Sequence, residues 1–100
     1  MHKEQEKYKI FVFKDDKSAS YGMPITQPTR GIFIRDIVQE EIRRGQSVFA
    51  RHPQDFSIFE IGEYDPQTGN VHLYETKNCL GLVSDFRTEA SPTPINQVVN

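Results

Sequence analysis

The stretch from Phe56 to Tyr74 constrains the fold more than any other part of the chain, because it reads as two strands joined by a tight turn. Residues 56–64 are rich in β-branched and aromatic side chains, as strands usually are. Residues 65–69 read Asp-Pro-Gln-Thr-Gly. Asp suits the first position of a type I turn, Pro presets the next dihedral, and Gly supplies the left-handed residue that closes a bulged hairpin. Residues 71–75 return as the second strand, so the sequence predicts a β-hairpin.

A further strand is predicted over residues 8–14, where aromatic and β-branched residues again dominate. Side chains alternate across a strand, so Tyr8, Ile10 and Val12 share one face, and Phe11 and Phe13 share the other. Both faces are apolar, and we expect both to be covered. Residues 20–25 resemble an irregular edge strand, because the nearby prolines at 24 and 28 disfavour a central position.

An amphipathic helix is predicted over residues 30–44. Thr29 is the candidate N-cap, and Gly45 is placed as a C-cap glycine after two arginines that favour the negative helix end. Apolar residues recur at helical spacing, and they suit packing on a sheet: Ile34, Ile37, Val38 and Ile42. The predicted fold class is therefore α+β, with a small antiparallel or mixed sheet (strands 8–14, 56–64 and 71–75) and one helix across one face.

The rest of the chain gives weaker signals. Residues 76–88 fit either a short helix or a packed loop. Residues 1–7 are predicted to be a flexible leader, 8–87 the single domain, and 88–100 an extended tail containing Pro, Ser and Thr. No apolar run approaches the roughly 20 residues that span a bilayer, and no signal peptide is recognisable. We therefore expect no membrane association.

Size and composition favour self-association. The chain has 100 residues, of which 36% are apolar, so its core is expected to be thin. The second apolar face of the sheet needs a cover, which the tail or a second subunit could provide. We predict a homo-oligomer, with a dimer favoured. The candidate oligomer or protein interface consists of Phe11, Phe13, Glu60 and Glu63.

Charge is unevenly distributed along a chain whose net charge is −2. Residues 53–75 carry five acidic residues and no Lys or Arg, a local charge of −5. Residues 30–52 carry five arginines against three acidic residues, a local charge of +2. Nucleic acid requires local positive charge, so its candidate site is Arg43, Arg44, Arg51 and Lys9. A solvated helix end with salt bridges explains the same arginines equally well.

Signs of catalysis are few. The three histidines are scattered along the sequence. The hairpin would place His72 beside Glu60 or Glu63, and a surface cross-strand pair accounts for this placement as well as a catalytic role does. Glu60 and Glu63 are three positions apart, so without a bulge they point to opposite faces of the strand. Cys79 has no second cysteine, and we expect a buried structural thiol and a reducing compartment. We predict no enzyme activity, no metal and no cofactor.

One run carries a family resemblance. Residues 52–69 read His-Pro-Gln-Asp-Phe-Ser-Ile-Phe-Glu-Ile-Gly-Glu-Tyr-Asp-Pro-Gln-Thr-Gly. This run resembles the small nonstructural protein of gokushovirus-type microviruses, which are single-stranded DNA phages. That family shows His-Pro-Glu-Asp, an aromatic, Phe-Glu-Leu-Gly-Glu, another aromatic, Asp and Thr-Gly. The similarity extends more loosely through the helix and the strand at residues 8–14.

The resemblance implies a phage accessory protein that assists single-stranded genome synthesis or packaging in the host bacterial cytoplasm. It implies no catalytic residues. The expected partners are single-stranded DNA or the phage replication initiator. The alternative is an oligomeric interaction module that acts on a phage or host protein without touching DNA.

Overall fold

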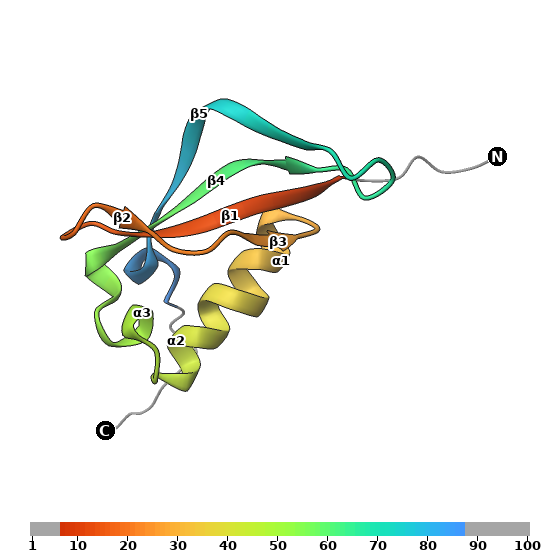
Figure 1. Ribbon diagram of the computed structural model, residues 1–100. Helices are drawn as coiled ribbons and strands as arrows, with labels where there is room; N and C mark the ends of the chain where they lie inside the picture. The colour runs from red at the N-terminus through yellow and green to blue at the C-terminus, as the bar shows by residue number, and fades with distance from the viewer. Residues whose placement is uncertain (1–6, 88–100) are drawn as a thin grey trace, which may run out of the picture.

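The computed structural model describes residues 7–87, which form an α+β domain in which one main helix lies across one face of an antiparallel five-stranded sheet (Figure 1). The strand order is β2-β1-β4-β5, and β3 pairs with β1 on the same side as β2. The strands are β1 (Tyr8–Asp15), β2 (Ser20–Tyr21), β3 (Ile25–Gln27), β4 (Phe56–Tyr64) and β5 (Val71–Leu82). The predicted fold class is confirmed. The predicted leader, apart from Lys7, and the predicted tail at 88–100 lie outside the described residues.

The main helix runs from Arg30 to Arg44, as predicted, in three consecutive segments: α1 (Arg30–Phe33), a π-helical stretch η1 (Ile34–Gln39) and α2 (Glu40–Arg44). Thr29 caps its start, because its hydroxyl accepts a hydrogen bond from the Ile32 amide at 3.1 Å. Gly45 ends it in the left-handed conformation, with φ of +72°. Both predicted caps are confirmed.

Aromatic rings fill the space between the sheet and its helices. Phe11 stacks on Phe33 of the helix with ring centroids 4.1 Å apart, and Phe13 stacks on Phe49 at 4.0 Å. Phe49 belongs to α3 (Val48–Arg51), which precedes the 3-10 turn η2 (Pro53–Asp55), and its ring also packs edge-on against Phe56 at 5.0 Å. Phe49 therefore packs beneath the sheet, whereas Val48 of the same helix is 43% exposed. Phe11 is 0% exposed and Phe13 is 4% exposed, so the helices of the same chain cover this face.

The hairpin between β4 and β5 closes as its sequence predicts. Gly69 has a φ of +80°, and its amide donates to the Asp65 carbonyl at 2.7 Å. The Asp65 carboxylate also accepts a hydrogen bond from the Gln67 amide at 2.9 Å. The turn is therefore held by local contacts alone, which explains why sequence reasoning found it.

Strand β5 is longer than the prediction of 71–75 and reaches Leu82, followed by the 3-10 turn η3 (Val83–Phe86). Residues 76–82 therefore form neither the helix nor the loop expected for them. The cause is long-range pairing: Cys79 lies opposite Phe59, and Gly81 lies opposite Ile58. Between these pairs and the hairpin end, the register shifts so that residues 74–77 bow away from β4, as Figure 1 shows.

A bulge in β4 changes which face its carboxylates occupy. Ile10 pairs with Gly62 and Phe11 with Glu60, so Ile61 is the extra residue. Glu63 pairs with Lys9 and Glu60 with Phe11, and these two positions of β1 share a face. Glu60 and Glu63 therefore lie on the same face, which corrects the opposite-face expectation for a regular strand.

Candidate nucleic-acid interface

The face of the sheet turned away from the helix carries the first candidate site. Residues opposite one another in antiparallel strands share a face. Lys14 follows the helix-facing Phe13 in β1, so its side chain lies on the helix-free face. Tyr21 pairs with Lys14 and therefore lies on the same face. Val12 pairs there with Phe59 and is 4% exposed. Strands β2, β1 and β4 thus place two aromatic rings and a lysine on one surface.

Tyr21 is the centre of this surface. Its ring meets Phe59 edge-on with centroids 6.0 Å apart. The Nζ atoms of Lys14 and Lys77 each lie 5.5 Å from the centroid of the Tyr21 ring. Tyr21 nevertheless remains 46% exposed. We call these four residues the Tyr21 cluster.

The Tyr21 cluster has the two components that single-strand binding requires. The exposed part of the Tyr21 ring offers aromatic surface against which a base can pack, and the ammonium groups near it offer charge for the phosphate between neighbouring bases. Lys77 comes from the bowed part of β5, so the irregular course of this strand brings its charge to a ring on β2. No sequence signal joins positions so far apart, and our sequence reasoning missed all four residues.

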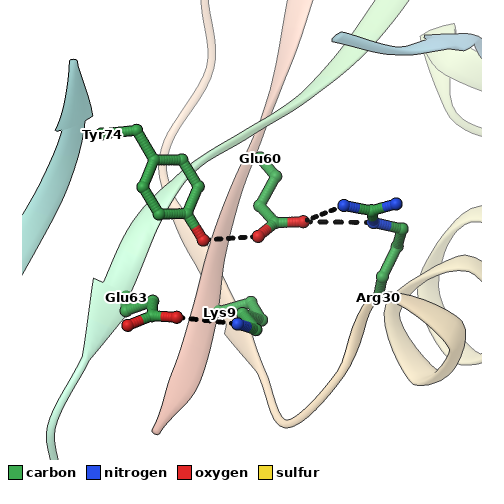
Figure 2. A network of polar contacts seen from close by, with 5 residues as sticks. All are labelled: Lys9, Arg30, Glu60, Glu63 and Tyr74. Atoms are coloured by element: carbon green, nitrogen blue, oxygen red, sulfur yellow. Dashed lines mark hydrogen bonds and ion pairs between the residues drawn. The ribbon is translucent and has the colours of Figure 1, made fainter. Parts of the chain in front are cut away.

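The opposite face contains a buried polar network, shown in Figure 2, whose centre is the Glu60 carboxylate. The Arg30 guanidinium donates to Glu60 Oε1 from Nε at 3.1 Å and from Nη2 at 3.0 Å. The Tyr74 hydroxyl donates to Glu60 Oε2 at 2.5 Å. Glu60 is 4% exposed, so these partners replace the water that its charge loses. The network joins the helix start, β4 and the bowed part of β5.

The polar network shifts the pKa of the Tyr74 phenol. Burial, followed by the hydrogen bond and the charge of Glu60, raises the pKa of the Tyr74 phenol above its ordinary value of 10.0. The phenol therefore remains a donor throughout the neutral pH range. This supports a structural role, because burial and the carboxylate that the phenol binds both favour its protonated form.

The four residues predicted for an oligomer or protein interface do not share one surface of the structure. Phe11 and Phe13 are in the core beneath the helix, so their rings are not on a surface that a second subunit could contact. This corrects the expectation that they need an outside cover. Glu60 is buried in its network. Glu63 pairs with Lys9, with 2.8 Å between Glu63 Oε2 and Lys9 Nζ, and this hydrogen bond lowers the pKa of the Glu63 carboxyl.

The residues predicted for nucleic-acid binding do not form one free cationic patch. Arg43 forms an ion pair with Glu40, and Arg44 Nε lies 3.3 Å from Glu40 Oε2. The hydrogen bonds from Arg43, followed by the charges of both arginines, lower the pKa of the Glu40 carboxyl. Arg51 is exposed at the end of α3 and forms no ion pair with any residue in the range 7–87. Salt bridges rather than a free cationic patch therefore account for Arg43, Arg44 and Lys9, because each has an acidic partner.

The remaining candidate residues are located on the surface of β5. His72 lies opposite Glu63, as the hairpin geometry predicts. Cys79 is exposed rather than buried, because it pairs with Phe59 on the helix-free face of a strand at the sheet edge. Within residues 7–87, no three His, Cys, Asp or Glu side chains are grouped to hold a metal ion. No helix in this range is long and apolar enough to cross a membrane.

A family described as "Phage ORF5 protein" matches residues 8–86, which include every strand and helix of the domain. No curated protein and no solved structure matches the chain.

Proposed function

The chain belongs to the Phage ORF5 protein family, and on this premise we propose that it is a phage accessory protein that binds single-stranded DNA across the helix-free face of its sheet. The observation that carries the proposal is the Tyr21 cluster: an exposed tyrosine ring with two lysine ammonium groups 5.5 Å from its centroid. Stacking on such a ring tolerates any base, because every base has a π face. The proposed binding is therefore independent of sequence.

The resemblance to gokushovirus-type microviruses, carried by residues 52–69, supports the same proposal. Phages with single-stranded genomes must handle that strand during synthesis and packaging. In this proposal the protein acts in the host bacterial cytoplasm and by binding alone, without a catalysed reaction. Direct contact with the replication initiator would serve the same process.

The net charge of −2 sets a condition on this proposal. Long-range attraction to DNA is weak for such a chain, so affinity has to come from local contacts. The cluster supplies two cations and an aromatic platform within one surface, whereas Arg43 and Arg44 share the charge of Glu40. We therefore favour the Tyr21 cluster over the arginine site.

Fluorescence anisotropy of a labelled oligothymidine tests the proposal. Tyr21→Ala should weaken binding by about 1–3 kcal/mol, the usual cost of losing one stacked base. Replacing Lys14 and Lys77 together with Gln should reduce the slope of log K against log salt by about 0.7 for each phosphate that the protein no longer neutralises. Lys17→Gln with Arg35→Gln is the matched control, because it removes the same charge from exposed positions outside the cluster.

Two results would contradict this assignment. If the wild-type chain shows no binding at low salt, direct DNA recognition is wrong. If instead binding survives in the cluster variants and disappears when Arg43, Arg44 and Arg51 are replaced with Glu, the arginine site is the interface.

A further inference from the structure

The two edges of the sheet are unequally protected. One edge consists of β2 and β3, which are two and three residues long, and prolines 24 and 28 flank β3. Short strands and prolines block pairing with another chain. The other edge is β5, which is 12 residues long and contains no proline. Within residues 7–87, no strand pairs with its outer side.

Strand β5 also exposes apolar side chains. Val71 is 56% exposed and Leu73 is 61% exposed. Each lies opposite a residue of β4 on the helix-free face, where Val71 pairs with Tyr64 and Leu73 with Gly62. A long edge that exposes apolar side chains, and whose outer side has no strand partner within residues 7–87, is a template for another strand.

The charges of β5 point to a second copy of the same strand. Glu75 and Lys77 flank Thr76 symmetrically, and both are exposed. If two copies of β5 pair antiparallel about a two-fold axis beside Thr76, Glu75 of each copy lies opposite Lys77 of the other. The same register sets Leu73 opposite Cys79. An isologous contact requires a self-complementary surface of this kind.

We propose that the protein forms a homodimer through antiparallel pairing of β5 with β5 of a second copy, centred on Thr76. The two sheets then become one continuous sheet. Both Tyr21 clusters lie on its helix-free face, and the unprotected edges are removed. Lys77 lies near both the dimer axis and the Tyr21 ring. The dimer does not depend on DNA binding, and its test contains no DNA.

Charge reversal tests both the interface and its register. Solution mass is measured by light scattering over a concentration series. Wild type should have the mass of two chains. Glu75→Lys alone and Lys77→Glu alone each place like charges opposite one another, so each should raise the dimer dissociation constant at least about tenfold. The combination of both changes restores opposite charges and should restore the dimer.

A disulfide provides a second measurement. Cys79 is the single cysteine of the chain, so wild type cannot form the proposed cross-link to position 73. In the Leu73→Cys variant, mild oxidation should give a covalent dimer through Cys79 of the second copy. Met23→Cys is the control, because residue 23 is 81% exposed between β2 and β3 at the opposite edge. It should remain largely uncross-linked.

Circular dichroism is used to check that each variant is folded, which is expected since the changed side chains are exposed. A monomer at every concentration would overturn the proposal. A dimer that ignores both single reversals, or a Leu73→Cys variant that cross-links no better than Met23→Cys, would overturn the β5 register. Either result leaves DNA binding by the Tyr21 cluster to its own test.

Discussion

Replacing Arg30 with alanine tests whether the buried Glu60 carboxylate is held by its ion pair. The change removes both guanidinium hydrogen bonds, at 3.1 and 3.0 Å, and leaves Glu60 with the Tyr74 hydroxyl. The Glu60 side chain is only 5% exposed, so few waters can replace the missing donors. The folded state should therefore lose stability relative to the unfolded chain, where water solvates the carboxylate.

The exposure of Arg30 and Glu60 sets the size of the expected loss in stability. Removing one partner of a fully buried pair costs about 3–5 kcal/mol, and an exposed pair contributes about 0–1 kcal/mol. The Arg30 side chain is 55% exposed, which places this pair between those limits. We expect a loss of about 2 kcal/mol. For a domain of this size, that corresponds to a fall in Tm of roughly 8–16 °C.

Urea unfolding followed by far-UV circular dichroism measures this deficit, since the chain has no Trp to report by fluorescence. Arg35→Ala is the matched control, because Arg35 has its own carboxylate partner but is exposed; its unfolding midpoint should not move. Adding Glu60→Gln should reduce the cost of removing Arg30. If Arg30→Ala is as stable as the control, the account of the network is wrong.

Two further predictions concern the same part of the sheet. Gly62→Ala should destabilise the fold by about 1–3 kcal/mol, because the added Cβ would lie 2.5 Å from the His72 carbonyl oxygen. Gly45→Ala is a steric control at a left-handed position, because a Cβ there meets nothing within 4 Å. If Gly62→Ala loses no more stability than Gly45→Ala, the packing argument is contradicted. Tyr74→Phe should cost about 1.5–3 kcal/mol at neutral pH, because the lost hydroxyl donates to the Glu60 carboxylate. Since the pKa of Tyr74 is raised above 10.0, its hydroxyl stabilises the fold below that pH, and this contribution is lost as pH rises further. Chemical unfolding at pH 8 and at about pH 11 should therefore show a larger loss of stability for the wild type than for Tyr74→Phe. Equal losses in the two proteins would exclude this linkage.

The parts of the fold that sequence reasoning identified are those with local causes. The hairpin turn depends on Asp65 and Gly69, which contact each other, and the helix limits depend on Thr29 and Gly45, which cap their own helix. Periodicity also identified the apolar stripe of the helix, although it did not reveal the π-helical turns. Local chemistry was sufficient for the fold class because the partners are only a few residues apart.

The candidate sites depend on partners that are distant in sequence. One extra residue at Ile61 moves Glu63 onto the face of Glu60, and the bow in β5 carries Lys77 to Tyr21. Neither displacement has a local signal, because strand register is decided by how complete strands pack together.

An α+β domain with a β-hairpin and one capped amphipathic helix can be predicted from the amino-acid sequence, because turn, cap and periodicity signals act over a few residues. Three outcomes could be read from the folded chain alone: Phe11 and Phe13 are covered by the chain's own helices, Cys79 is exposed, and the Nζ atoms of two lysines lie over the Tyr21 ring. Those outcomes depend on strand order and bulges, which arise from contacts between β1, β2, β4 and β5 rather than from any one segment.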